Sequence, residues 1–181
     1  MSDNRRIAIM GGSESGKTAL AIAISLGLWN RDKTRTLAFD PFLKKHNWGR
    51  HAWATDEFQK FEHVVFRVKG CAAFWDEGTS SGGRDRDKVK MFTAVRHHHA
   101  FFAFMGHDHT TMLPIMRGSL TDVILFRQSD SAAQYWADLF TDKEILRSTG
   151  LDQYVALHKR AFRPVRELRF SEAELKKGVT L

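Results

Sequence analysis

The sequence predicts an α/β fold, a three-layer sandwich in which helices cover both faces of a mostly parallel central sheet. Two observations support this prediction. Short apolar runs alternate with helical segments along the chain, and strands connected through helices pair in parallel by right-handed crossovers. The runs are also apolar along their whole length, which is typical of strands buried on both faces. In such sheets a ligand binds beyond the carboxyl ends of the strands.

The first half of the chain supplies alternating strands and helices. A short apolar run bounded by charge and glycine predicts the first strand, and the Ala-, Ile- and Leu-rich stretch after it predicts a buried helix. A second strand stops at Pro41, and Thr55 followed by two acidic residues predicts the start of a short helix. The expected strands are 6–10, 33–40, 64–68 and 71–75, and the expected helices are 17–29 and 55–61.

The second half continues the alternation and ends in a small β-hairpin. Charged residues predict the start of a helix at 84, and the Ser-Asp-Ser cluster at 129–131 is a typical helix cap. The expected helices are 84–97, 129–140 and a helical turn at 111–116; the expected strands are 100–105, 122–126 and the hairpin strands 154–157 and 165–170. We expect residues 1–150 to form the core, and residues 151–181 to form a hairpin and a helical or frayed tail packed on the same domain.

Composition narrows the class of protein. The 181 residues include 28 Lys and Arg against 21 Asp and Glu, a formal net charge of +7 that favours polyanions such as nucleic acid or nucleotide phosphates. The single cysteine, Cys71, excludes a disulfide framework and a zinc knuckle of several cysteines. No apolar run approaches the roughly 18–20 residues that span a bilayer. We therefore expect a soluble protein of a reducing cytoplasm.

A phosphate-binding loop is the strongest motif in the sequence. Residues 11–18 fit the pattern G-x-x-x-x-G-K-[ST], with an apolar strand before them and a helix after them. In such a loop, backbone N–H groups and the positive end of the helix cradle nucleotide phosphates. We expect Lys17 to reach the β- and γ-phosphates of ATP and the Thr18 hydroxyl to bind Mg²⁺. The predicted nucleotide-binding residues are Gly11, Gly12, Ser13, Glu14, Ser15, Gly16, Lys17 and Thr18.

Two acidic residues after a later strand supply the partner that this loop requires. We expect Asp76 to hold Mg²⁺ through a water molecule, and Glu77 to polarise the water that attacks the γ-phosphate. Such a pair favours Mg²⁺-dependent ATP hydrolysis over transfer to a small acceptor. A small-molecule kinase is the less favoured alternative, because the sequence has no arginine-rich lid.

The chain resembles the FtsK/HerA superfamily of P-loop ATPases, and within it the small genome-packaging ATPases of membrane-containing double-stranded DNA viruses and phages. Besides the phosphate loop and the run Phe-Trp-Asp-Glu-Gly at 74–78, the resemblance rests on residues 36–41, which end in Asp-Pro, and on residues 95–107 and 122–127. It implies a P-loop NTPase sandwich. It also implies homo-oligomeric rings, usually hexamers, with ATP held between subunits.

The resemblance further implies a role and partners. It predicts an ATP-driven motor that contacts double-stranded DNA through phosphates and packages a viral genome into a preformed capsid. Capsid or portal-vertex proteins are the expected further partners, and the expected location is the host cytoplasm or the virion vertex. The alternative from another class is a non-translocating P-loop ATPase switch in partitioning or assembly. That alternative predicts nucleotide-dependent association without any dependence on DNA.

The sensor position departs from the family pattern. Family motors usually carry glutamine at the tip of the sensor strand, whereas this chain has His107 followed by Asp108. Histidine can donate one hydrogen bond as glutamine does, so His107 is the predicted sensor and Asp108 the alternative. A ring site also needs an arginine from the neighbouring subunit to stabilise the transition state. The resemblance favours Arg96 for this role over Arg117 and Arg127.

Histidine and basic clusters are the remaining candidates. A zinc site is one possible role for the histidines, with Cys71 or Asp108 completing it. The histidines concerned are His97, His98, His99, His107 and His109. Consecutive histidines point in different directions, so a polar loop facing a pore or phosphates is favoured. Two basic sets are candidates for DNA phosphates, although solvated surface charge explains the first equally well. They are Arg84, Arg86, Lys88 and Lys90, and then Lys159, Arg160, Arg163, Arg166 and Arg169.

Overall fold

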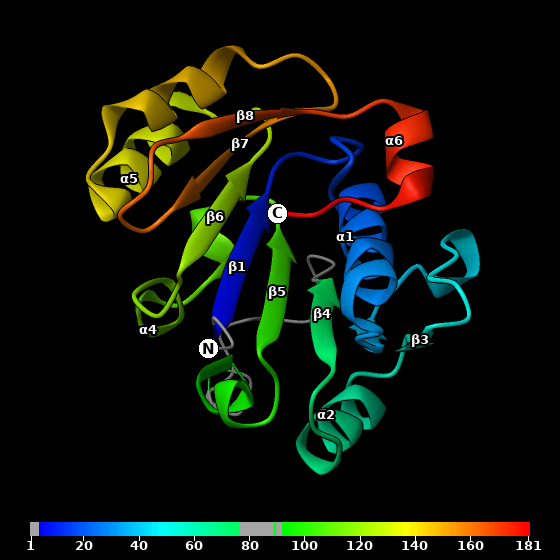
Figure 1. Ribbon diagram of the computed structural model, residues 1–181. Helices are drawn as coiled ribbons and strands as arrows, with labels where there is room; N and C mark the ends of the chain where they lie inside the picture. Colours follow the sequence, from blue (N-terminus) through cyan, green and yellow to red (C-terminus); the bar gives the residue numbers. More distant parts are fainter. Residues whose placement is uncertain (1–3, 77–88, 90–91) are drawn as a thin grey trace.

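The computed structural model describes residues 4–76, 89 and 92–181, and it confirms the α/β class (Figure 1). One sheet of eight strands has the order β3-β2-β4-β5-β1-β6-β7-β8. Neighbouring strands from β3 to β6 are parallel, and β7 and β8 extend the sheet antiparallel at one edge. The strands are β1 (Arg5–Met10), β2 (Thr36–Phe39), β3 (Ala52–Thr55), β4 (Ala72–Asp76), β5 (Phe101–Gly106), β6 (Asp122–Leu125), β7 (Val155–Arg160) and β8 (Arg166–Arg169).

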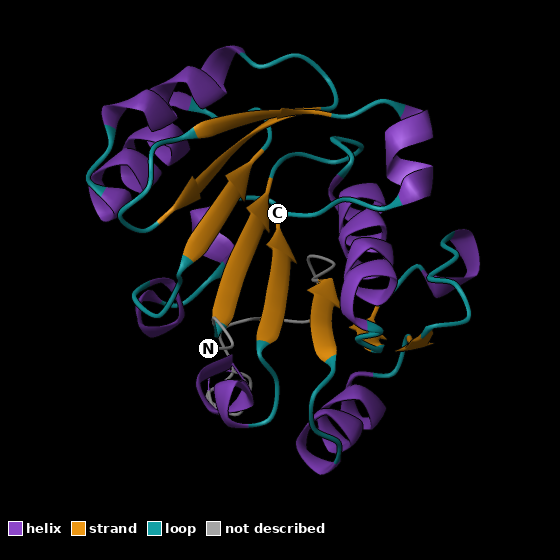
Figure 2. Ribbon diagram, in the orientation of Figure 1, coloured by secondary structure: helices purple, strands orange, loops and turns teal. Residues whose placement is uncertain are grey.

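Helices cover both faces of this sheet, as Figure 2 shows. The α-helices are α1 (Lys17–Asp32), α2 (Phe58–Arg67), α4 (Pro114–Arg117), α5 (Asp130–Phe140) and α6 (Glu172–Lys177). Short 3₁₀ segments are η1 (Leu43–Lys45), η2 (Val95–His97), η3 (His109–Thr111) and η4 (Lys143–Gly150). Half of the expected helix at 84–97 lies outside the described residues, and its described end contains η2.

Two apolar cores lie between the layers, because side chains of a strand alternate between the faces of the sheet. Along β5, Phe102 and Phe104 belong to the core under α2, α4 and α5, whereas Phe101, Ala103 and Met105 belong to the core under α1 and α6. All six residues of β5 are buried. The unbroken apolar character of this strand in the sequence therefore has the cause we inferred for it.

The segment 52–68 differs from the prediction. Thr55 ends the edge strand β3 instead of capping a helix, and α2 includes residues 64–67 of the segment 64–68, which was expected to form a strand. Within α2, Phe61 and Val65 are four residues apart, lie on the same side of the helix and are fully buried, while the polar residues of the helix face outward. The apolar run at 64–68 thus belongs to one side of an amphipathic helix, a pattern that a window of five residues does not distinguish from a strand.

The C-terminal hairpin joins the central sheet. β7 pairs with β6 and β8 with β7, so the expected hairpin is confirmed, and α6 packs on α1. The Ser129 hydroxyl accepts a hydrogen bond from the amide of Ala132, which confirms the predicted cap of α5. In the described parts of the chain, no helix is long and apolar enough to cross a bilayer.

Candidate nucleotide-binding site

The phosphate loop connects the end of β1 to the start of α1. Glu14 and Gly16 have left-handed φ values of +58° and +102°, and this kind of backbone turns successive N–H groups toward an anion. A Cβ on Gly11 would lie 2.7 Å from the Cβ of Phe126, so glycine is required there for space. The Ser15 Oγ is buried without a hydrogen-bond partner among the described residues. An orphaned hydroxyl in this loop fits a phosphate ligand.

Lys17 folds its side chain back over the loop. Its Nζ donates hydrogen bonds to the carbonyl oxygens of Gly11 at 2.8 Å and Gly12 at 2.7 Å. Burial lowers the pKa of Lys17, and the nearby carboxylate of Asp76 opposes this effect. Both acceptors are uncharged, so a phosphate oxygen can replace them with a stronger, charge-assisted hydrogen bond.

Thr18 and Asp76 meet at the carboxyl edge of the sheet. The Thr18 Oγ1, in the first turn of α1, donates to Asp76 Oδ2 at 2.9 Å, and Asp76 is the last residue of β4. Burial raises the pKa of Asp76, while the hydrogen bond from Thr18 acts in the opposite direction. Oxygen donors from a hydroxyl and a carboxylate suit a hard divalent cation such as Mg²⁺. The two residues expected to bind the metal are thus adjacent in space although 58 positions apart in sequence.

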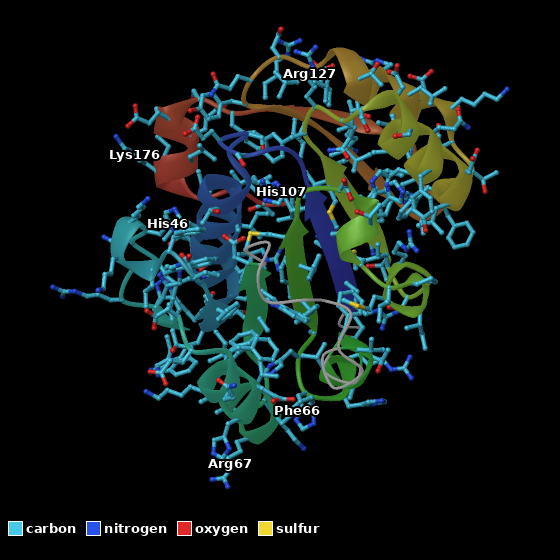
Figure 3. All side chains as sticks on the ribbon, turned by 180° about the vertical axis from the view of Figure 1, so that it is seen from behind. His46, Phe66, Arg67, His107, Arg127 and Lys176 are labelled. Carbon is cyan, nitrogen blue, oxygen red and sulfur yellow. The ribbon has the colours of Figure 1, made fainter. Side chains whose placement is uncertain are left out.

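The sensor position lies at the end of the neighbouring strand β5. The amide of Gly11 donates to the carbonyl of Gly106 at 3.2 Å, so His107 directly follows a residue bonded to the loop (Figure 3). The Asp108 Oδ1 accepts hydrogen bonds from the amide and hydroxyl of Thr110. Burial alone would raise the pKa of Asp108, but these hydrogen bonds hold it below its usual value. Because Asp108 caps η3, His107 is the better sensor candidate of the two.

Glu77, the expected water-polarising residue, lies outside the described residues, as do the basic residues Arg84, Arg86, Lys88 and Lys90.

The three candidate arginines occupy different environments. Arg96 is exposed in η2, and its carbonyl accepts a hydrogen bond from Asn4, just before β1, so it lies at the amino edge of the sheet. Arg117 packs its guanidinium 4.7 Å from the centre of the Tyr135 ring. Arg127 is exposed two residues after the end of β6, on the same edge as the phosphate loop (Figure 3). Arg96 is therefore remote from the loop of its own chain.

The consecutive histidines do not converge on one point. His99 is buried, with Nε2 2.8 Å from the carbonyl of Val65 and Nδ1 accepting from the amide of Cys71. His98 stacks edge-on against Phe66, and His97 accepts a hydrogen bond from Arg96. Within the described ranges, no three His, Cys, Asp or Glu side chains form a metal-binding group.

The C-terminal basic set is only partly a surface. Lys159 is buried and donates to Asp142 and to the carbonyl of Arg163, which anchors the β7–β8 turn. Arg169 pairs with Glu167. The expectation that Lys159 faces a polyanion is therefore wrong, because its ammonium group is already engaged inside the protein.

Sequence reasoning missed two groups beside the site. The ring of Tyr154 packs against Gly16, where a Cβ would approach it to 3.0 Å. Asp40, at the end of β2, accepts hydrogen bonds from both His46 and Trp48. The Asp-Pro ending of β2 was noted as a feature of the sequence, but its histidine and tryptophan partners follow only from the turn at 41–48.

Comparison with known proteins found similar solved structures, whereas no family model and no curated protein matches the chain. The DNA-packaging ATPase B204 from Sulfolobus Turreted Icosahedral Virus has a TM-score of 0.72 at 13% identity, covering 94% of this chain and 100% of that chain. The genome packaging NTPase B204 from Sulfolobus turreted icosahedral virus 2 in complex with ATP-gammaS gives 0.72 at 13% identity, with coverages of 92% and 97%. The same NTPase in complex with AMPPCP gives 0.70 at 13% identity, with the same coverages.

These similarities confirm the expected fold. Nearly the whole length of each chain is matched. The protein therefore shares the fold of these solved packaging ATPases, the three-layer sandwich that the resemblance of its motifs implied.

Proposed function

We propose that this chain is an ATP hydrolase that drives the packaging of double-stranded DNA into a viral capsid. The observation that carries the proposal is the contact between Thr18 and Asp76, which joins the phosphate loop to the acidic end of β4. Similarity of fold to packaging NTPases crystallised with ATP analogues supports the choice of substrate and process. The net charge of +7 is compatible with a polyanionic partner.

The loop residues 11–18 would hold the phosphates, and Lys17 would exchange its carbonyl acceptors for oxygens of the β- and γ-phosphates. Thr18 and Asp76 would hold Mg²⁺, which neutralises charge on the phosphates when bound. His107, beside the loop, would sense the terminal phosphate. Glu77 keeps its assigned role of polarising the attacking water.

In this proposal the working unit is a homo-oligomeric ring. Arg96 would act on the nucleotide of a neighbouring subunit, because it lies at the opposite edge of the sheet from Lys17 in its own chain. Capsid or portal-vertex proteins would anchor the ring, in the host cytoplasm or at the virion vertex. DNA would be contacted through its phosphates, which allows movement without reading sequence.

Steady-state ATP hydrolysis tests this proposal, measured over a range of protein concentrations with and without double-stranded DNA. We expect a rate per subunit that rises with protein concentration and rises again with DNA. The variant Lys17→Ala is the control and should lose hydrolysis under every condition. A rate indifferent to both variables would contradict the motor and favour the non-translocating switch.

A further inference from the structure

A buried carboxylate lies next to the metal-binding edge of the site and orients a histidine. The side chain of Asp40 has no exposed surface, and it accepts three hydrogen bonds from its own loop. The amide of Phe42 donates to Oδ1 at 2.8 Å, and both His46 Nδ1, at 2.7 Å, and Trp48 Nε1, at 2.9 Å, contact Oδ2. This loop therefore holds His46 against a fixed acceptor.

Strand register brings this group to the nucleotide edge. In the parallel pair of β2 and β4, Phe39 lies opposite Trp75. The next residues, Asp40 and Asp76, therefore lie side by side where the two strands end, and neighbouring strands are about 4.8 Å apart. Both carboxylates belong to the sheet face that α1 covers, since Asp76 contacts Thr18 of α1 and Asp40 contacts the buried Trp48 of the same core.

The electrostatics of Asp76 reflect the same proximity. The Asp40 carboxylate is among the influences that raise the pKa of Asp76, after burial, and His46 is among those that lower it. Such effects require that both groups lie within a short distance of the metal-binding carboxylate. Figure 3 shows His46 on the loop after β2, beside the end of the sheet at which His107 also lies.

The hydrogen bond to Asp40 fixes the chemistry of the imidazole. A carboxylate accepts, so Nδ1 of His46 is the donor, and in the neutral ring this leaves Nε2 with a lone pair as an acceptor. No hydrogen bond to Nε2 is formed within residues 4–76, 89 and 92–181. The side chain is 28% exposed, so water can reach it.

We propose that His46 is a further catalytic residue of the nucleotide site, whose Nε2 accepts a hydrogen bond from the water that attacks the terminal phosphate. Asp40 is its positioning residue. This inference rests on the proposed ATP hydrolysis. It is compatible with the role expected of Glu77, because a water molecule has two O–H groups and can donate to both acceptors.

A purely structural role is the competing explanation, in which His46 only braces the loop 41–48. Two variants separate the explanations. His46→Asn retains an N–H near the position of Nδ1 and can keep the bond to Asp40, but it lacks Nε2. Trp48→Phe is the matched control, because it removes the other donor to the same carboxylate oxygen and leaves His46 in place.

The experiment measures kcat for ATP hydrolysis, affinity for a non-hydrolysable ATP analogue, affinity for ADP with aluminium fluoride, and stability in urea. For His46→Asn we expect kcat to fall about 100-fold, as for other losses of alignment of a reacting group. Affinity for the ATP analogue should stay within about twofold, while affinity for the aluminium fluoride complex, which mimics the transition state, falls about tenfold. Trp48→Phe should lose stability but keep kcat within about twofold of the parent.

Three results would overturn the inference. One is a His46→Asn protein whose kcat is unchanged while the parent hydrolyses ATP. Another is an equal loss of kcat in both variants, which would assign His46 to loop structure. If the parent itself binds nucleotide but does not hydrolyse it, the proposed function fails and this inference fails with it, a result distinct from the other two.

Discussion

At the scale of single residues, one strongly perturbed acid lies far from the candidate nucleotide site. Asp122 has no exposed side-chain surface and accepts hydrogen bonds from Arg5, His158 and Thr121. Burial by itself would raise the pKa of Asp122, but these hydrogen bonds and the Arg5 charge lower it from 3.8 to about 2. The group ties the start of β1 to β6 and β7, so it joins the hairpin to the parallel sheet.

This ion pair predicts an acid-dependent stability. Because the folded-state pKa is depressed, the carboxylate stabilises the protein above about pH 4 and loses that contribution as the pH falls toward 2. The shift corresponds to about 2 kcal/mol at neutral pH. Asp122→Asn should lower the free energy of unfolding by about 3–5 kcal/mol at pH 7, because it also leaves Arg5 without its partner. Urea unfolding at pH 7 and at pH 3 measures both effects.

The exposed Asp152 provides the control for this prediction. Asp152→Asn should change the unfolding free energy by less than about 0.5 kcal/mol at either pH. Equal stability of the parent and Asp122→Asn at pH 7 would contradict the role given to the ion pair.

His99 makes a titrating contribution of the same sign as that of Asp122, but in a higher pH range. Burial lowers the pKa of His99, and its ring nitrogens bridge Val65 on α2 and Cys71 before β4. The unfolded chain takes up a proton below about pH 6.5 that the folded protein does not, so the stability present above that pH falls as the pH drops. His99→Gln should cost about 1–3 kcal/mol at pH 7.5 and reduce the slope of stability between pH 7 and 5.

Chemical denaturation across this pH range measures the slope. His63→Gln, at an exposed position of α2, should leave both stability and slope unchanged. An unaltered slope in His99→Gln would show that other histidines carry the acid sensitivity.

The residues also show what a sequence can predict about a site. The phosphate loop was predictable because eight consecutive residues carry the motif, and the pairing of Thr18 with Asp76 followed from where parallel strands end. The link between Asp40 and His46 was not, because it depends on the path of the turn at 41–48. Tyr154 reaches Gly16 from a distant part of the chain, and no local pattern marks such a contact.

At the scale of elements, a glycine in α1 allows the C-terminal segment to cross the helix at close range. Gly27 lies on the buried side of α1, and a Cβ there would approach the carbonyl oxygen of Val179 to 2.2 Å. The amide of Val179 donates to the carbonyl of Ala23 at 2.8 Å, so residues 178–181 lie directly on the helix. Gly178, with φ of +91°, makes the turn that brings them there.

Gly27→Ala is therefore expected to destabilise the protein although alanine favours helices by about 1 kcal/mol. The new methyl group would displace residues 178–181 and remove the Val179 hydrogen bond and its apolar contacts. We expect a net loss of about 1–2 kcal/mol in unfolding free energy and faster hydrogen exchange at the Val179 amide.

Hydrogen exchange with urea unfolding measures this pair of effects. Gly150→Ala is the comparison, because a Cβ there meets no atom within 4 Å. A more stable Gly27→Ala protein with unchanged exchange at Val179 would contradict the close crossing.

Elements differ in how far the sequence determines them. Strands such as β5 were predictable because they are buried on both faces and apolar throughout. The edge strand β3 has one buried residue, Thr55, so Ala-Trp-Ala-Thr carries little pattern. In α2 the buried residues are Phe61 and Val65, and only their spacing over a longer window distinguishes the helix from a strand. Burial from both sides, more than propensity, made an element predictable here.

At the scale of the whole molecule, the two edges of the sheet carry different groups. The phosphate loop, Asp76 and His107 lie at the carboxyl edge, whereas Arg96 lies beside the starts of β1 and β5. The six residues of β5 separate these edges by about 20 Å. An arginine at that distance does not reach the nucleotide site of its own chain, so in the proposed ring it would act on a nucleotide bound to a neighbour.

A mixing experiment tests whether Arg96 acts between subunits. Arg96→Ala keeps an intact phosphate loop, and Lys17→Ala keeps an intact arginine, so each alone should lose hydrolysis by at least about 10³-fold. In an equimolar mixture, about one interface in four pairs a sound loop with a sound arginine. We therefore expect the mixture to recover up to about a quarter of the parent rate, measured as steady-state ATP hydrolysis at fixed total protein.

Arg127→Ala makes the comparison informative, because Arg127 is exposed on the same edge as the loop of its own chain. If Arg127 acts on its own nucleotide, its variant mixed with Lys17→Ala recovers nothing, since each chain then carries a defect that no neighbour supplies. If the mixture with Lys17→Ala recovers hydrolysis for Arg96→Ala but not for Arg127→Ala, Arg96 is the arginine that acts between subunits and the site is composed of residues from two chains. Two inactive variants that fail to complement would contradict action between subunits. Full activity of Arg96→Ala alone would remove Arg96 from the site, because a charge that stabilises the transition state is not dispensable.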